Sequence, residues 1–186
     1  IYGAAPGGST LDGPLTSINA DLLIFADNDL QLQTTRGADM YKTLLVATDG
    51  SKLSDKALAH AIGMAQAMGS TLTAFYAAPD YPMPAYADGV VYEPVSRKEY
   101  AKLAAEDAQK ILEAAATKAE TAGVTCKTAY AIAAAPWEAI LAAAKKHKCD
   151  AIVMASHGRR GISAVLLGSE TQKVLTHSKL PVMVVR

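Results

Sequence analysis

The sequence has few cysteines and no pairing of them that would suggest a disulfide or metal framework. Its 186 residues contain two cysteines, Cys126 and Cys149, with no Cys-x-x-Cys pair and no Cys/His spacing of a zinc site. Proteins that depend on disulfides or structural zinc carry such patterns. We therefore interpret both cysteines as reduced, structural thiols of a cytoplasmic protein.

Net charge and long hydrophobic runs are also missing. Eighteen basic residues balance eighteen acidic ones, so no overall field attracts nucleic acid or an anionic membrane. The apolar run at residues 22–26 is far shorter than the roughly 20 residues of a membrane-spanning helix, and no basic residues precede it, as they would in a signal peptide. We expect neither nucleic-acid nor membrane partners, and any anion site must be local.

The sequence lacks the motifs of common nucleotide-dependent and hydrolytic enzymes. There is no G-x-x-x-x-G-K-[ST] loop, no G-x-G-x-x-G after the first strand, no nucleophile elbow and no zinc-binding helix motif. We predict no catalytic residues, no protein-bound metal and at most slow hydrolysis.

Composition divides the chain near Met40. Residues 1–39 are rich in Gly, Pro, Ser, Thr, Asn and Asp, and their short runs at 21–26 and 30–35 are typical of a hairpin. We predict that residues 1–39 are an extension or added leader without a chemical role, and that residues 40–186 form one domain.

From Met40 onward, strand and helix patterns alternate, which predicts an α/β domain with a parallel sheet covered by helices. Two Ser-x-x-Glu/Gln capping boxes, at Ser96 and Ser169, predict helix starts. The expected strands are 43–48, 71–77, 125–133, 151–155 and 182–185, and the expected helices are 52–68, 97–122, 136–148 and 169–178.

Residues 80–95 are expected to form a long irregular loop, in which Tyr81, Tyr86 and Tyr92 stand among prolines. Such loops are often functional. The tyrosines either stack on a base or pack on the domain's own surface. The basic run 145–148 is interpreted as the solvated end of a helix rather than as a nucleic-acid patch.

Residues 154–171 place two glycine turns and a helix start directly after an apolar strand. Glycine lets backbone amides approach an anion closely, and a helix N-terminus adds unpaired N–H groups. This pattern indicates phosphate binding at Gly158 and Gly168 and at the amides of Ser169, Glu170 and Thr171.

Asp49 follows the first predicted strand, and the glycine turn at His157 follows the fourth. If these strands are neighbours, both lie in one crevice at the carboxyl edge of the sheet. Asp49 then binds sugar hydroxyls or a metal, or it caps the helix that starts near Ser51. For His157 we favour a structural role or a hydrogen bond to ligand over general-base catalysis.

Three features together resemble the universal stress protein family over residues 40–186. They are the opening strand and turn 43–51, the closing segment 176–185, and the stretch 155–169. That stretch is similar to the family's G-x-x-G-x(9)-G-[ST] nucleotide motif, with Ala155 in place of the first glycine.

The resemblance implies an open, doubly wound five-stranded parallel sheet of order 3-2-1-4-5 with helices on both faces, similar to Rossmann-like adenine nucleotide alpha hydrolases. It also implies a cytoplasmic homodimer that pairs through its last strand, binds ATP (possibly with Mg²⁺) and regulates a stress response through protein partners. The alternative is a nucleotide-free dimeric interaction module of the same fold.

The family's nucleotide contacts fall on these residues. Asp49 is implied to hold the ribose, and the backbone at Ala47, Thr48, Ala77 and Met154 the adenine. The phosphate contacts are implied for Gly158, Gly168, Ser169 and nearby amides, and the implied nucleotide site also includes Ala155, His157, Arg159, Glu170 and Thr171.

Overall fold

The structure is a computed structural model that describes residues 41–81, 85–87, 90–92, 95–159 and 167–186. The predicted leader, residues 1–39, and its hairpin lie outside the described residues.

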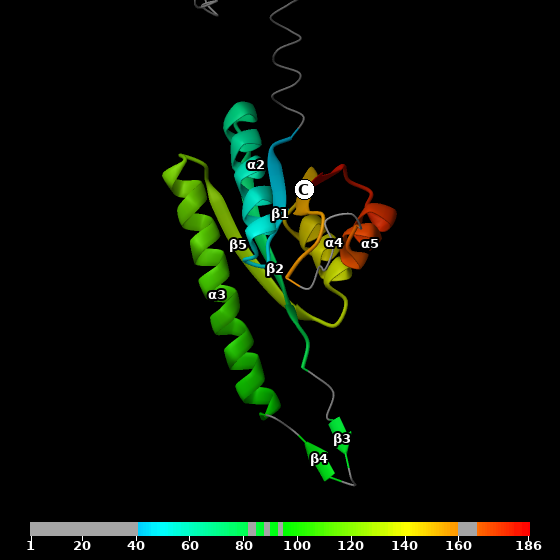
Figure 1. Ribbon diagram of the computed structural model, residues 1–186. Coiled ribbons are helices and arrows are strands. Elements are labelled where there is room, and N and C mark those ends of the chain that lie inside the picture. The colour runs from blue at the N-terminus through cyan, green and yellow to red at the C-terminus, as the bar shows by residue number, and fades with distance from the viewer. Residues whose placement is uncertain (1–40, 82–84, 88–89, 93–94, 160–166) are drawn as a thin grey trace, which may run out of the picture.

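Five parallel strands form the central sheet of the domain (Figure 1). Their order is β5-β2-β1-β6-β7, which confirms the predicted 3-2-1-4-5 order. Apolar side chains fill the central strands because helices cover both faces of the sheet. The strands are β1 (Thr43–Ala47), β2 (Thr71–Pro79), β5 (Cys126–Ala133), β6 (Ala151–Ala155) and β7 (Val182–Val185).

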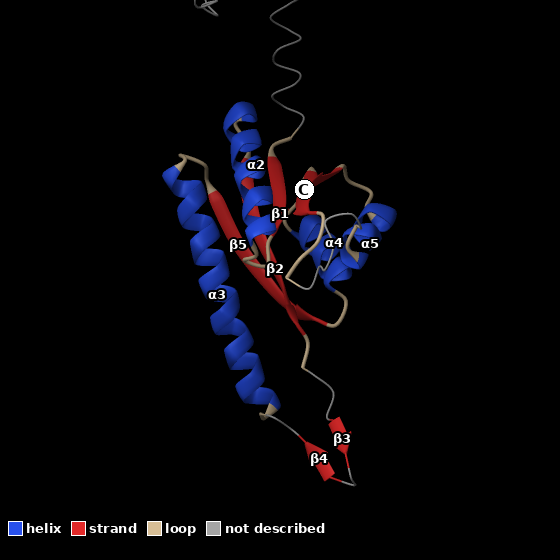
Figure 2. Ribbon diagram, in the orientation of Figure 1, coloured by secondary structure: helices blue, strands red, loops and turns tan. Residues whose placement is uncertain are grey.

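The helices form one layer on each face of the sheet, which makes the domain doubly wound and Rossmann-like (Figure 2). Helices α2 (Lys52–Met68) and α3 (Arg97–Thr121) share one apolar layer with the sheet. Helices α4 (Pro136–Lys146) and α5 (Ser169–His177) pack on the opposite layer. The predicted helix positions are confirmed to within two residues at each end.

The helix ends follow their local sequence with one exception. The Ser51 side chain accepts from the Ser54 amide, Ser96 accepts from the Glu99 amide, and Gly69 ends α2 with φ of 66°. The predicted cap at Ser169 is wrong: Gly168 is the N-cap of α5 and Ser169 is already helical. The cause is that the turn before α5 is held by the backbone of Gly168, so no capping side chain is needed.

The predicted irregular loop 80–95 contains a short antiparallel hairpin, β3 (Ala85–Ala87) and β4 (Val90–Tyr92). Tyr81 packs on the domain's own surface: its ring contacts Tyr100 edge-on, and its hydroxyl donates to the Val95 carbonyl at 2.7 Å. The side chains of Tyr86 and Tyr92 lie outside the described residues.

Both cysteines are free, with Cys149 buried beside β6 and Cys126 half-buried at the start of β5. Burial raises the pKa of both thiols, so they are poor nucleophiles. No helix in the described part of the chain combines the length and apolarity needed to cross a membrane.

Candidate functional site

Strands β1 and β6 are neighbours, with Ala47 opposite Met154. This register brings the residues that follow the two strands together at the carboxyl edge of the sheet. The Asp49 carboxylate accepts two backbone hydrogen bonds there, one from the Arg159 amide at 2.7 Å and one from the Ser51 amide at 3.0 Å. Asp49 therefore lies against the turn that follows β6, as expected for neighbouring strands.

Gly158 allows this approach. A β-carbon at Gly158 would lie 2.6 Å from Oδ2 of Asp49, a distance that side-chain carbons do not tolerate. The positive-φ glycines of the described chain are Gly50, Gly69 and Gly123, so Gly158 is not required for its backbone conformation. The missing side chain serves the contact with Asp49.

The hydrogen bonds to Asp49 favour its charged form. Partial burial by itself would raise the pKa of Asp49, but hydrogen bonds from Ser51, from the Arg159 amide and from Ser54 outweigh burial and lower the pKa. Asp49 is not the cap of α2, because Ser51 occupies that position. The site thus contains a fixed carboxylate at neutral pH.

Gly168, the last glycine of the motif, holds α5 against the turn after β6. The Gly168 amide donates to the Ser156 carbonyl at 2.8 Å. A β-carbon at Gly168 would lie 3.1 Å from that carbonyl oxygen and 3.2 Å from Cα of His157. Glycine therefore lets the start of α5 pack directly on the first turn.

The N-terminus of α5 offers hydrogen-bond donors. The first intrahelical bond runs from the Gln172 amide to the Gly168 carbonyl, which leaves the N–H groups of Ser169, Glu170 and Thr171 without a carbonyl from α5. Within the described ranges, no other group accepts from these three amides. Such amides, with the positive end of the helix dipole, favour an anion.

Ala155 departs from the glycine of the family motif at no conformational cost. It lies in β6, pairs with Val185, and is not among the residues with positive φ. Its methyl group is part of the buried apolar layer under α2 and α3. Its carbonyl accepts a hydrogen bond from the buried Thr171 hydroxyl at 3.0 Å, which ties α5 to the end of β6.

Glu170 points toward α4. Its Oε2 accepts from the Trp137 amide at 3.0 Å, and its Oε1 lies 3.0 Å from Nζ of Lys173. Helix α4 has no side-chain cap of its own at Ala135. Glu170 supplies that cap from the neighbouring helix, so its charge is compensated where it lies.

Three of the residues expected near adenine share one face of the sheet. Ala47, Ala77 and Met154 lie toward the ends of β1, β2 and β6, on the layer that faces α4 and α5. Thr48 differs: its hydroxyl is 3.2 Å from the Ser54 hydroxyl and accepts from the Gly50 amide at 3.3 Å. The Thr48 side chain therefore stabilises the turn after β1, and its backbone amide donates to the Phe75 carbonyl.

His157 and Arg159 are held by neighbours in this turn. Nδ1 of His157 lies 3.2 Å from the Ser156 hydroxyl. The Arg159 guanidinium lies 3.5 Å from the Asp107 carboxylate on α3, so its side chain is directed to the opposite side of the sheet from Met154. Arg159 contributes to the site through its backbone.

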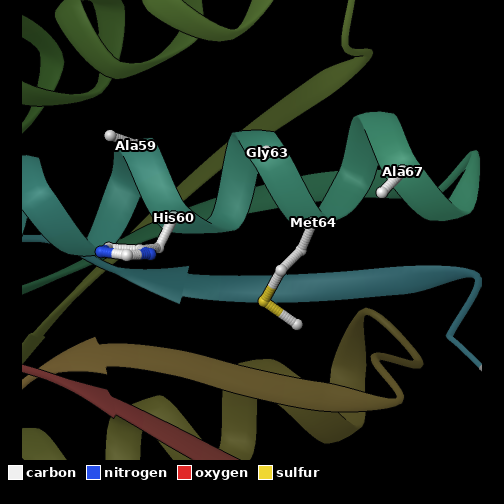
Figure 3. A pocket seen from close by; sticks show the side chains of 5 residues that line it. All are labelled: Ala59, His60, Gly63, Met64 and Ala67. Atoms are coloured by element: carbon white, nitrogen blue, oxygen red, sulfur yellow. The ribbon is translucent and has the colours of Figure 1, made fainter. Parts of the chain in front are cut away.

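No group of three His, Cys, Asp or Glu side chains suited to a metal ion occurs within the described part of the chain. A hollow of about 480 Å³ lies along α2, away from this site, and is lined by Ala59, His60, Gly63, Met64 and Ala67 (Figure 3). It shares no residue with the crevice beside Asp49.

Comparison with known proteins agrees with this arrangement. The sequence model of the universal stress protein family matches residues 40–186. The chain belongs to the universal stress protein family. A universal stress protein of Thermus aquaticus is 36% identical over 147 residues, which cover 79% of this chain and 100% of that protein.

Two solved structures of similar proteins share the universal stress protein fold. Hypothetical protein MJ0577 of Methanocaldococcus jannaschii has a TM-score of 0.64 at 25% identity, over 78% of this chain and 96% of that one. A universal stress protein in complex with cAMP has a TM-score of 0.57 at 29% identity, over 79% of this chain and 98% of that one.

Two residues of this universal stress protein site were not expected from the sequence. Trp137 binds Glu170 through its amide, and Asp107 binds the Arg159 side chain. Pro136 predicted where α4 begins, but nothing in the sequence showed which carboxylate would accept from the amides of its first turn. Asp107 stands 52 positions from Arg159, on a helix with several other exposed charged residues.

Proposed function

We propose that this universal stress protein binds ATP, as the magnesium complex, in the crevice between Asp49 and the start of α5. One observation carries the proposal: the β1–β6 pairing brings a charged carboxylate, two close-packed glycines and a helix N-terminus to one edge of the sheet. A sugar hydroxyl donates to a carboxylate, and phosphate oxygens accept from backbone amides.

Each part of ATP has a matching part of the crevice. The fixed Asp49 carboxylate has lone pairs left to accept from ribose hydroxyls after its two backbone bonds. Gly158, Gly168 and the amides of 169–171 would hold the phosphates. The apolar face at Ala47, Ala77 and Met154 would receive the adenine ring. The turn after β6, with Ala155, His157 and the Arg159 backbone, would complete the nucleotide site.

The solved relative at 29% identity that binds cAMP supports an adenine nucleotide as the ligand class. Among the described residues, the group beside Nδ1 of His157 is the uncharged Ser156 hydroxyl, whereas a general base is usually oriented by a further polar partner. We therefore propose a regulatory, cytoplasmic role in which nucleotide binding alters a surface for protein partners, with at most slow hydrolysis.

The proposal is tested by nucleotide release and by binding. Denaturing the purified chain should release adenine nucleotide, and Mg-ATP should raise the melting temperature of nucleotide-free protein. Gly168→Val should abolish ATP binding, because its side chain would collide with Ser156 and His157. ATP affinity that is unchanged in this variant, or absent from the wild type, would refute the proposal.

The strand at the other end of the sheet supports a homodimer. β7 is the last strand in the order, so one of its edges is unpaired among the described residues, and the Met183 side chain on this strand is 41% exposed. An apolar edge strand is a template for pairing with a second copy. The alternative function, a nucleotide-free dimeric interaction module, is favoured by the two backbone bonds that already occupy Asp49.

A further inference from the structure

A second cavity lies between α2 and α3 at the carboxyl end of β1. It has a volume of about 240 Å³ and is lined by Thr48, Gly50, Asp55, Lys110, Ile111, Ala114, Ala115, Lys118 and Arg159. The five α3 residues recur at helical spacing, so they form one stripe that faces the start of α2.

Small residues open this cavity. Ala114 and Ala115 separate the two lysines of α3, and Gly50 forms the wall opposite. Gly50 has φ of +74°, and a β-carbon there would lie 3.2 Å from both Nη2 of Arg159 and Cγ1 of Ile111. Both the backbone conformation and the space therefore require glycine at this position.

Positive charge predominates among the lining side chains. Lys110, Lys118 and Arg159 contribute three cations, against the single carboxylate of Asp55. Asp55 binds Lys118 at 2.8 Å, and Asp107 lies 3.5 Å from Arg159. Across the described ranges, no carboxylate pairs with Lys110.

The two ion pairs leave their cations available to a ligand. The side chains of Lys118 and Asp55 are 50% and 47% exposed, and those of Arg159 and Asp107 are each 49% exposed. Ion pairs this exposed contribute little to stability. A multiply charged anion can therefore recruit both cations without a large cost.

This cavity adjoins the proposed ATP crevice at Thr48 and Arg159 but opens on the other face of the sheet. Ala47, Ala77 and Met154 face α4 and α5, whereas the cavity is walled by α2 and α3 on the other face of the sheet. Its volume is below the roughly 300–1,000 Å³ of pockets that hold drug-sized ligands. It suits a small anion better than a whole nucleotide.

We propose that the cavity between α2 and α3 binds a small phosphate-bearing anion, with Lys110, Lys118 and Arg159 as its ligands. Lysine binds phosphate as a point charge, and arginine binds it through paired N–H groups. The Arg159 backbone holds Asp49 in the ATP crevice. Arg159 would thus belong to both sites, with its guanidinium on the small anion and its backbone in the ATP crevice.

Inorganic pyrophosphate is the probe, titrated calorimetrically into the full chain without magnesium at constant ionic strength. The wild type should bind it, and Lys110→Gln should weaken binding by about tenfold, the loss expected for one hydrogen bond to a charged group. Lys102→Gln is the matched control, because Lys102 lies on the same helix and is 76% exposed outside the cavity. Its affinity should equal that of the wild type.

Gly168→Val distinguishes the two sites. Pyrophosphate binding should survive this substitution, and Mg-ATP binding should survive Lys110→Gln. The proposal is overturned if the wild type does not bind pyrophosphate, if Lys110→Gln and Lys102→Gln behave alike, or if Gly168→Val abolishes pyrophosphate binding. The last result would place pyrophosphate in the ATP crevice and leave the proposed function standing.

Discussion

Oδ2 of Asp49 occupies the space where a β-carbon of residue 158 would be, 2.6 Å from the ideal position of that carbon. The carboxylate fits there because residue 158 is glycine, and the adjacent Arg159 amide donates to the same oxygen at 2.7 Å. This contact joins the end of β1 to the end of β6, across 110 positions of sequence.

Gly158→Ala should destabilise the fold by about 1–3 kcal/mol, the usual cost of an overpacked methyl group. The reason is that Asp49 must move and lose its bond to the Arg159 amide. Urea unfolding measures this cost, and a double-mutant cycle assigns it. In an Asp49→Ala background the same substitution should cost much less, and an equal cost in both backgrounds would contradict the contact.

Gly63→Ala is the control for glycine substitution itself. Gly63 lies within α2, and a β-carbon there meets nothing within 4 Å. Alanine should stabilise the protein by roughly 0.5–1 kcal/mol, because glycine loses more conformational freedom in a helix.

Asp49→Asn should lower stability at neutral pH by roughly 1–2 kcal/mol, because the uncharged amide cannot accept both backbone bonds. The pKa of Asp49 is lowered below 3.8 in the folded state. Its carboxylate therefore stabilises the fold above pH 3.8, and this contribution is lost as the pH falls through the folded-state pKa.

Urea titrations of wild type and Asp49→Asn across acidic pH test this dependence. The difference in unfolding free energy should be constant near neutral pH and should shrink below about pH 3.8. A difference that grows on acidification would mean that the folded-state pKa is raised, contrary to the hydrogen bonds at Asp49.

The strands, the helices and the strand order were predictable because each depends on short-range pattern or on the family resemblance. The runs 44–47 and 151–155 are apolar throughout, as in buried parallel strands, and they lie in β1 and β6. The hairpin β3–β4 was missed because two strands of three residues carry little periodicity.

The site was predictable only as a set of residue types. The sequence predicted that Asp49 and the glycines lie close together, but not that the missing side chain of Gly158 makes room for the Asp49 carboxylate. The direction of Glu170 toward Trp137 was also hidden, since it depends on how α4 and α5 pack. Contacts between distant segments are not encoded in local pattern.

Glu170→Ala should destabilise the protein by about 1 kcal/mol, the typical cost of a lost helix cap. Glu170→Gln should cost less, because its amide oxygen still accepts from the Trp137 amide. Urea unfolding compares the two variants. If Glu170 instead faced bound phosphate, its removal would raise ATP affinity by several-fold; we expect no increase, because the carboxylate lies against α4 and Lys173.

Met183→Glu tests the proposed dimer. Met183 is 41% exposed on β7, and a charge on an unpaired edge strand opposes pairing with another chain. Wild-type protein should sediment as a dimer, and the variant should dissociate at a concentration about tenfold higher or more. Leu103→Glu is the matched control. Leu103 is 51% exposed on α3, a helix that contacts β2 and β5 and therefore lies toward the end of the sheet opposite β7. A monomeric wild type, or equal dissociation of both variants, would exclude β7 as the interface.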